Sequence, residues 1–315
     1  MASCDSAMLD STALLLVTDF CHQWRSRTLM IDPLIVEKLI LTALEEDIGF
    51  ADLTTEIVIP KSARARLVLN ARTPMVIAGI DIAGQIFRRR VPDCDYQAKV
   101  EDGDRVAAGT ALAVVSGLAR GLLTAERTVL NLLQHLSGIA TLTAQYVERI
   151  QGTRAVLIDT RKTLPGLRAL EKHAAQVGGA RNHRLRLDDG VLIKDNHIAI
   201  CGSIRAAVER ARTATPILTK IEVECDTLEQ VRETLESGAD CILLDNMSVT
   251  QMREAVVMAD GRVPLEASGG VRLETIRAIA ETGVDFISVG RITQSAPAVD
   301  IGLDIALDIE PAART

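Results

Sequence analysis

The stretch IEVECDTLEQVRETLESGADCILLD (221–245) decides the fold class of this chain. It contains two short apolar runs, IEVE (221–224) and CILLD (241–245), separated by a segment whose apolar residues recur at helical spacing. Runs of this length, rich in Ile, Val and Leu, are typical of buried strands. Because a strand, a helix and a second strand follow one another, the stretch predicts two neighbouring strands of a parallel sheet.

The same alternation continues on both sides of this stretch. Further apolar runs lie at AVLID (155–159), VLIKD (191–195), VPLEAS (263–268) and DFISVG (285–290), and VTQMREAVVMADG has a helical pattern. We therefore predict an α/β fold from about residue 155 onward, with a parallel sheet that is either open or closed into a barrel.

Most of these runs end in a polar residue or a glycine. Glu224, Asp245, Ser268 and Gly290 end four consecutive runs at intervals of 21, 23 and 22 residues. The carboxyl ends of parallel strands face one cleft, so we expect these residues to line a common site. Glu224 and Asp245 should form a carboxylate pair, which suits general acid/base work, Mg²⁺ ligation or hydrogen bonding to sugar hydroxyls.

The segment 154–194 is basic, although the whole chain has a net charge of −7. Nine cations and four acids give this segment a local charge of +5, which favours a small polyanionic ligand over a solvated face with scattered ion pairs. The negative chain, with 2% aromatic residues, argues against nucleic acid or an anionic membrane as partner. The counted residues are Arg154, Arg161, Lys162, Arg168, Lys172, Arg181, Arg184, Arg186 and Lys194, against Asp159, Glu171, Asp188 and Asp189.

Two glycine-containing turns at strand ends predict a phosphate site. Ser268-Gly269-Gly270 precedes a segment with helical spacing (271–283), and Ser288-Val289-Gly290 ends the next run. Glycines let backbone N–H groups approach a phosphate, and a helix N-terminus adds partial positive charge. One such turn is often only a turn, but the pair on consecutive strands favours a sugar phosphate.

The first half of the chain has a different pattern. Residues 1–30 are Ser/Thr-rich without clear periodicity, whereas 33–44 predicts a helix and 64–117 predicts short strands. A long helix is expected from Leu123 to about Ile150, with a break near Ser137-Gly138.

Neither cysteines nor histidines show a metal-binding pattern. The six cysteines have no regular spacing, no stretch is apolar over 18 residues, and the N-terminus is a poor signal peptide, so we expect a cytoplasmic protein with reduced thiols. None of the five histidines has a His or Cys at ligand spacing. His183, within the basic segment, is the best functional candidate, while His135 and His173 on predicted helices are expected to be structural.

Several segments together resemble the quinolinate phosphoribosyltransferase family. They are LTAERT…LNLLQHLSGIAT (123–141), DTRKTLPGLRALEKHA (159–174), GGARNHRLRLDDGVLIKDNHI (178–198), ILLDNM (242–247) and EASGGV (266–271). The resemblance implies an incomplete (open) α/β barrel over 132–295 with an N-terminal α/β sandwich domain over 31–131. The tail 296–315 would return to the first domain, and residues 1–30 would be an extension.

The resemblance also implies an activity and an assembly. The reaction joins quinolinate to 5-phosphoribosyl-1-pyrophosphate (PRPP) and gives nicotinate mononucleotide, pyrophosphate and CO₂. Mg²⁺ would act with PRPP near Glu224 and Asp245, with no residue assigned as its ligand. A homodimer with a shared active site is implied, in which the partner subunit's Arg127 completes each site, and larger homo-oligomers are left open.

The family's residues can be carried over one by one. Lys162, Lys194, Glu224 and Asp245 would be catalytic. The wider set would bind quinolinate, the pyrophosphate, the ribose hydroxyls and the 5′-phosphate. It comprises Arg127, Thr160, Arg161, Lys162, His183, Arg184, Lys194, Glu224, Asp245, Ser268, Gly269, Gly270, Val289, Gly290 and Arg291. The complete cation set favours a dicarboxylate over nicotinate, which has one carboxylate.

Three alternatives compete with this interpretation. A nicotinate phosphoribosyltransferase or another homologue of the same fold would need fewer cations. A non-catalytic scaffold would gain nothing from uncompensated cations in a cleft. A sugar-phosphate isomerase or aldolase would explain the phosphate turns and Lys194, but not the Arg/His cluster.

Overall fold

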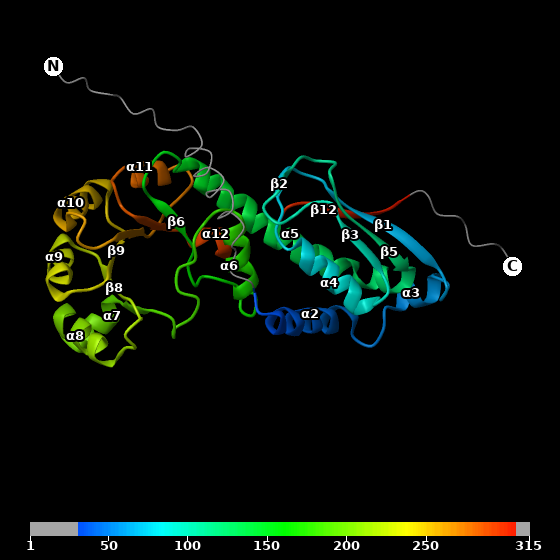
Figure 1. Ribbon diagram of the computed structural model, residues 1–315, viewed down its shortest axis with the longest axis horizontal. Coiled ribbons are helices and arrows are strands. Elements are labelled where there is room, and N and C mark those ends of the chain that lie inside the picture. Colours follow the sequence, from blue (N-terminus) through cyan, green and yellow to red (C-terminus); the bar gives the residue numbers. More distant parts are fainter. Residues whose placement is uncertain (1–30, 307–315) are drawn as a thin grey trace, which may run out of the picture.

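The computed structural model describes residues 31–306, which form two parts joined by one long helix (Figure 1). The expectations for residues 1–30 and for the end of the C-terminal tail lie outside the described residues. In Figure 1 the parallel strands and their helices lie to the left, and an antiparallel sheet lies to the right. No helix within the described ranges is both long and apolar enough to cross a membrane.

The N-terminal part is built on a four-stranded antiparallel sheet in the order β12-β1-β5-β3. Its strand β12 comes from the C-terminal end of the described chain and pairs with β1 from Leu67↔Ile305 to Ala71↔Ile301. Alternate residues of β1, including Leu67 and Leu69, are buried under the covering helices. The elements are α2 (Pro33–Ile48), α3 (Leu53–Val58), β1 (Arg64–Ala71), β2 (Met75–Val76), α4 (Ile80–Arg90), β3 (Asp95–Ala98), β4 (Arg105–Val106), β5 (Ala111–Leu118) and β12 (Ile301–Ile305).

Helix α5 (Ala119–Arg149) is continuous over 31 residues, so the expected break at Ser137-Gly138 is wrong. Gly138 instead lets the chain at Pro297 pass close to the helix, because a Cβ at this position would lie 2.2 Å from the carbonyl oxygen of Pro297. Ser137 is fully buried and accepts a hydrogen bond from the backbone N–H of Ala78 at 3.1 Å. Both residues therefore fit chain segments against the helix and leave its axis intact.

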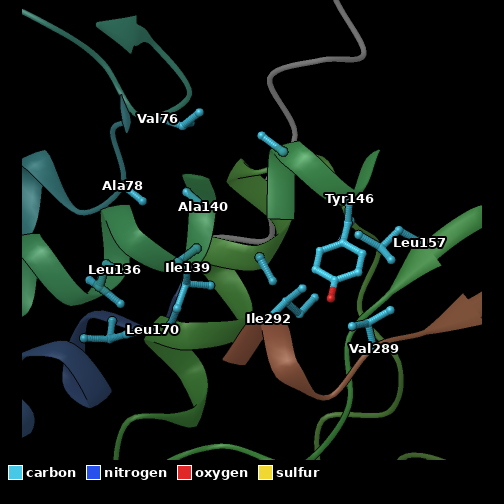
Figure 2. Close-up of a cluster of buried hydrophobic side chains, with 14 of the residues drawn as sticks. Val76, Ala78, Leu136, Ile139, Ala140, Tyr146, Leu157, Leu170, Val289 and Ile292 are labelled. Carbon is cyan, nitrogen blue, oxygen red and sulfur yellow. The ribbon is translucent and has the colours of Figure 1, made fainter. Parts of the chain in front are cut away.

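The second half of α5 belongs to the core of the other part. Figure 2 shows Tyr146 of α5 beside Leu157 of the parallel sheet and Val289, which directly follows that sheet's strand at 286–288, and it places Ile139 and Leu170 in the same buried cluster. All five side chains are buried. One rigid helix thus connects the N-terminal sheet with the base of the parallel sheet.

The C-terminal part contains six parallel strands in the order β6-β11-β10-β9-β8-β7. The edge strands β6 and β7 do not pair with each other, so the barrel is open, and an isolated bridge joins Ile158 to Arg181 on that side. The predicted α/β class with an open barrel is confirmed. The strands are β6 (Val156–Ile158), β7 (Val191–Ile193), β8 (Ile221–Cys225), β9 (Cys241–Asp245), β10 (Leu265–Ser268) and β11 (Phe286–Ser288).

Helices α9 and α10, which connect successive strands, form as predicted. Each begins with a reciprocal capping pair, Thr227 with Gln230 and Ser248 with Gln251. The remaining strands and helices of this part also alternate along the chain. The helices of this part are α6 (Arg168–Val177), α7 (Asp195–Cys201), α8 (Ile204–Ala214), α9 (Leu228–Ser237), α10 (Val249–Ala259), α11 (Ile276–Ala280) and α12 (Arg291–Gln294).

The predicted helix after the glycine pair is wrong in its position. Gly269 and Gly270 have φ values of +90° and +61°, which are not helical, and α11 begins only at Ile276. No helix N-terminus therefore adjoins this turn. The short helix α12 follows the other turn directly, with Gly290 as its N-cap.

Candidate active site at the carboxyl ends of the strands

The parallel register brings Glu224 and Asp245 to the same edge of the sheet. Glu224 lies near the end of β8 and Asp245 ends β9, which is hydrogen-bonded to β8. Ser268, at the end of the next strand, is paired directly with Asp245. The structure therefore gathers three of the predicted residues at the carboxyl edge of the sheet.

Glu224 is held by a cation from the neighbouring strand. The ammonium group of Lys194, which follows β7, contacts the Glu224 carboxylate. The backbone N–H of Lys194 donates to His197 Nδ1 at 2.9 Å, which fixes the start of α7. Lys194 remains 47% exposed, so it can contact a ligand while it neutralises Glu224.

The loop after β6 lies against the turn after β11. Thr160 Oγ1 accepts the backbone N–H of Lys162 at 3.0 Å, and the carbonyl of Lys162 accepts the hydroxyl of Thr293 at 2.8 Å. The side chain of Lys162 crosses Gly290 so closely that a Cβ there would lie 2.7 Å from Lys162 Cδ. This glycine is required to seat the lysine beside the turn that also carries Arg291.

Two guanidinium groups come together beside this loop. Arg161 Nε is buried and has no hydrogen-bond partner in the part of the chain that the structure describes. Arg184 donates to the carbonyl of Gly190 at 2.9 Å. Burial, and after it the positive charge of Arg161, lowers the pKa of Arg184. Asp189 and Glu222 partly offset the charge of Arg184, but neither guanidinium forms an ion pair within residues 31–306, so the two can bind an anion with two acidic groups.

His183 is fixed at four points rather than pointing freely into the cleft. Its backbone N–H donates to Asp159 at 2.8 Å, and its carbonyl accepts from Lys172 at 3.1 Å. Its Nε2 lies 2.9 Å from Glu222 Oε2 and 3.4 Å from Glu266 Oε2. These contacts hold the loop that carries Arg184.

The protonation of His183 is subject to two opposing influences. Burial disfavours its charged form, but hydrogen bonds to Glu222 and Glu266 outweigh burial and raise the pKa of His183 to about 10. The backbone N–H of Arg184 favours the neutral ring, because it donates to Nδ1 at 2.7 Å. In either state the Nε2–H group faces the two carboxylates, so it is not offered to a ligand.

Glu222 and Glu266 are buried close together, and their pKa values shift in opposite directions. Burial raises the pKa of Glu266 to about 7, against the hydrogen bond from His183. For Glu222 the bond from His183 outweighs burial and lowers the pKa. Ligand atoms of His183, Glu222 and Glu266 lie within 4.8 Å of one another, close enough for a metal ion. The distance of 2.9 Å between His183 Nε2 and Glu222 Oε2 is that of a hydrogen bond, and this bond satisfies both groups without a metal.

Part of the basic segment is paired inside the protein, where Asp159 and Lys172 are buried together. Asp159 and Lys172 are buried at 0% and 1% exposure, and their charged groups lie 2.5 Å apart. Glu171, also fully buried, accepts from His135 Nε2 at 2.9 Å and from the backbone N–H of Leu164 at 3.2 Å. The buried pair of Asp159 and Lys172 removes one cation and one acid, so it leaves the local charge of +5 unchanged.

The predicted phosphate residues are placed around two turns. Val289 is buried and its N–H donates to the carbonyl of Ile158 at 3.1 Å, so this N–H is not available to a phosphate. Ser268 is only partly buried. The space beside Gly270 is open, because no atom lies within 4 Å of a Cβ built there, and a ligand can approach its backbone.

Arg127 is the one predicted site residue that precedes the parallel sheet in the chain. It lies on the N-terminal half of α5 and its side chain is exposed. Within residues 31–306, no hydrogen bond or ion pair joins its side chain to another residue. Within the described residues, the Arg127 guanidinium is therefore not engaged by another side chain.

Comparison with known proteins decides the family. The sequence matches the family description "Quinolinate phosphoribosyl transferase, N-terminal domain" over residues 52–137 and "Quinolinate phosphoribosyl transferase, C-terminal domain" over residues 139–304. The chain belongs to the quinolinate phosphoribosyl transferase family.

Relatives of this family cover most of the chain. It is 47% identical over 269 residues to "Nicotinate-nucleotide pyrophosphorylase [carboxylating]" of Mycobacterium leprae, which spans 84% of this chain and 94% of that protein. It is 38% identical to "Quinolinate phosphoribosyltransferase [decarboxylating] 2, mitochondrial" of Nicotiana glauca, over 89% of this chain and 85% of the relative. Both domains of the family are thus present here.

Solved structures agree with this assignment. The nicotinate-nucleotide pyrophosphorylase of Francisella tularensis superposes with a TM-score of 0.85 at 37% identity, covering 88% of this chain and 98% of that one. Human nicotinic acid phosphoribosyltransferase shares the fold at a TM-score of 0.56 and 13% identity, over 85% of this chain and 73% of that one.

For this member of the quinolinate phosphoribosyl transferase family, sequence reasoning missed the groups that hold the site together. Asp159, Glu171, Lys172 and Glu266 support the cation loops from inside, and Asn246 contacts Asp245 directly. The one available signal was the spacing of Glu222 and Glu224, which places both on one face of β8. Adjacent charged residues on a helix, such as Glu171 and Lys172, look like a solvated face in a sequence.

Proposed function

We propose that this chain transfers the phosphoribosyl group of PRPP to quinolinate and releases nicotinate mononucleotide, pyrophosphate and CO₂. The observation that supports the proposal is the pair Arg161 and Arg184, two cations close enough for the charge of Arg161 to lower the pKa of Arg184, in a chain that also brings Glu224 and Asp245 to one edge of the sheet. Quinolinate has two adjacent carboxylates, and PRPP develops positive charge on its ribose as pyrophosphate leaves.

Each group of the site has a task in this reaction. Arg161 and Arg184 bind the quinolinate carboxylates and orient its ring nitrogen toward C1 of the ribose. Lys162 and Lys194 contact the leaving pyrophosphate and stabilise its negative charge. Glu224 and Asp245 hold the ribose hydroxyls and stabilise the oxocarbenium-like transition state. The turns at Ser268–Gly270 and Val289–Arg291 receive the 5′-phosphate.

Mg²⁺ is expected to enter with the pyrophosphate of PRPP. The carboxylate oxygens of Glu224 and Asp245 are hard ligands of the kind that Mg²⁺ prefers, so the local chemistry fits this ion. Bound Mg²⁺ would neutralise charge on the leaving group. Lys162 and Lys194 supply the same kind of stabilisation from the protein.

Decarboxylation requires little further chemistry from the protein. Once the ring nitrogen is joined to ribose it is positively charged, and it stabilises the carbanion left when the adjacent carboxylate departs as CO₂. A proton from water then replaces the lost carboxylate on this carbon. The task of Arg161 and Arg184 is then to hold the ring while this bond breaks.

We also propose that the working unit is a homodimer in which the partner subunit's Arg127 completes each site. Two features support this assembly. Arg127 is exposed on helix α5, which precedes all the barrel cations in the chain. Four large apolar side chains at one corner of the N-terminal part are 67% to 111% exposed, a surface that a second copy would cover. They are Phe50, Leu53, Ile57 and Val58.

A cytoplasmic location is part of the same proposal. The cysteines within the described residues, Cys94, Cys201, Cys225 and Cys241, are free thiols. Unpaired thiols of this kind suit a reducing compartment.

The decisive experiment compares two acceptors. Purified protein is incubated with Mg²⁺, PRPP and either quinolinate or nicotinate, and mononucleotide and CO₂ are followed. Formation of both products from quinolinate, with none from nicotinate, is the expected result. Turnover of nicotinate alone would replace the proposal with a nicotinate phosphoribosyltransferase, and silence with both substrates would contradict it.

A further inference from the structure

Asn246, the residue after Asp245, has an unusual backbone. Its φ is +54°, and among the described residues only Asn246 and Asp260 combine a side chain with positive φ. Asp260 ends helix α10, where this conformation is common. Asn246 instead follows a strand, and its N–H donates to the carbonyl of Ser268 at 3.0 Å. Strained backbone of this kind concentrates at functional sites.

This conformation directs the Asn246 side chain back onto Asp245. Asn246 Nδ2 donates to Asp245 Oδ2 at 2.6 Å. The other end of the amide lies over Gly269, where a Cβ would be 2.2 Å from Asn246 Oδ1. The position directly after β10 must therefore be a glycine, because a side chain there would collide with the Asn246 amide.

The two carboxylates of the site are held in chemically different ways. Glu224 is paired with the ammonium group of Lys194, which cancels its charge. Asp245 is held by a neutral amide, and no ion pair within residues 31–306 includes it. An amide donor fixes the orientation of a carboxylate without cancelling its charge. Asp245 is thus the carboxylate that keeps its full negative charge.

We propose that Asn246 is a positioning residue that fixes the Asp245 carboxylate, still fully charged, toward the positive charge that develops on the ribose. This inference rests on the proposed function. Asn246 itself need not touch the substrate, since it acts through Asp245. Glu224 and Lys194 then serve mainly as a neutral pair that binds hydroxyls and pyrophosphate.

Asn246→Gly tests the proposal, because glycine keeps the left-handed backbone and removes only the amide. Loss of one hydrogen bond to a charged group predicts that kcat falls about tenfold, while KM for quinolinate and for PRPP stays within about twofold. Ser248→Ala is the matched control. It removes the N-cap of α10 two residues away, does not touch Asp245, and should leave kcat unchanged.

A double-mutant cycle separates an indirect role from a direct one. If Asn246 acts through Asp245, then Asn246→Gly lowers kcat no further in a protein that already carries Asp245→Ala. A further loss in the double variant, or an unchanged kcat in Asn246→Gly, would overturn the proposal.

A crystal structure of Asn246→Gly gives a readout that needs no activity. The expected result is an Asp245 carboxylate turned away from its wild-type position or spread over several rotamers. An unmoved carboxylate would also overturn the inference. Absence of wild-type turnover with quinolinate, by contrast, would contradict the proposed function, and the crystal structure would then test the positioning role alone.

Discussion

Lys172 Nζ lies 2.5 Å from Asp159 Oδ1 in the interior of the barrel and 3.1 Å from the carbonyl oxygen of His183. One buried cation on α6 therefore joins the end of β6 to the loop that carries Arg184. Asp159 completes the link, because it also accepts the N–H of His183 and the amide of Asn182. The spacing of the two cation loops is set from inside the protein.

Lys172→Met is expected to destabilise the fold by about 3–5 kcal/mol, because it leaves the buried Asp159 without a counter-charge. Burial already raises the pKa of Asp159, so the unpaired carboxyl would take up a proton. Asp159→Asn combined with Lys172→Met should recover much of the loss, since neither charge is then buried. Urea unfolding of the three proteins measures this, and a double variant no more stable than Lys172→Met would refute the explanation.

Glu266 predicts how stability depends on pH. Its pKa is raised from 4.5 to about 7 in the fold, mainly by burial. Between these values the folded protein keeps a proton that the unfolded chain releases, so stability falls as pH rises through this window. The total is about 3 kcal/mol, at about 1.4 kcal/mol for each pKa unit.

Glu266→Gln should remove this decline, because glutamine keeps the shape and does not titrate. Urea unfolding at several values between pH 5 and pH 7 should show wild type losing stability relative to the variant. The Glu266 carboxylate also helps to raise the pKa of His183, and the variant loses this effect. The comparison is therefore confined to the pH range in which Glu266 itself titrates. Parallel curves for the two proteins would contradict the assignment.

The parallel sheet was predictable because short apolar runs and helical segments alternate regularly in the sequence. Apolar runs such as CILLD, each followed by an amphipathic helix, allow few arrangements, and the common edge at which Glu224 and Asp245 lie follows from strand direction. Gly138 shows where this reasoning stops. A glycine inside a helical pattern was interpreted as a break, but it makes room for Pro297, which is far away in sequence.

Side-chain partners were less predictable than strand ends. Lys172 and Glu171 are adjacent on α6, and nothing local distinguishes them from the half-buried Arg168 or the exposed Arg186. Their burial depends on the loops that fold over α6, and the same holds for His183, whose Nε2 faces two carboxylates from different strands. The chemical types of the site were visible in the sequence, whereas the supporting contacts required three-dimensional structure.

Arg184→Met should weaken quinolinate binding without weakening the fold. Loss of hydrogen bonds between a guanidinium and a carboxylate predicts a rise in KM for quinolinate of about 10- to 100-fold. Stability should change by less than about 1 kcal/mol, because the lost contact with Gly190 is offset by relief of repulsion from Arg161. Steady-state kinetics and urea unfolding measure the two effects. Arg186→Met, an exposed neighbour, is the control, and equal KM values for the two variants would contradict the role of Arg184.

The shared site predicts that two inactive proteins can restore each other. Arg127→Ala and Lys194→Ala homodimers should both be inactive, the first for lack of the partner subunit's Arg127 and the second for lack of a barrel lysine. A mixed dimer has one intact site, formed by the barrel with Lys194 and an unaltered Arg127. Random assortment of equal amounts of the two chains into two-fold dimers gives about a quarter of the wild-type number of sites.

Co-expression with two different tags isolates the mixed dimers for assay with quinolinate. A matched control combines Arg161→Ala with Lys194→Ala, both in the barrel, where each site of a mixed dimer still lacks one cation. Activity in the first combination and none in the second would establish that Arg127 acts across the dimer. If purified mixed dimers of the first kind are as inactive as the control, Arg127 belongs to the site of its own chain or to none.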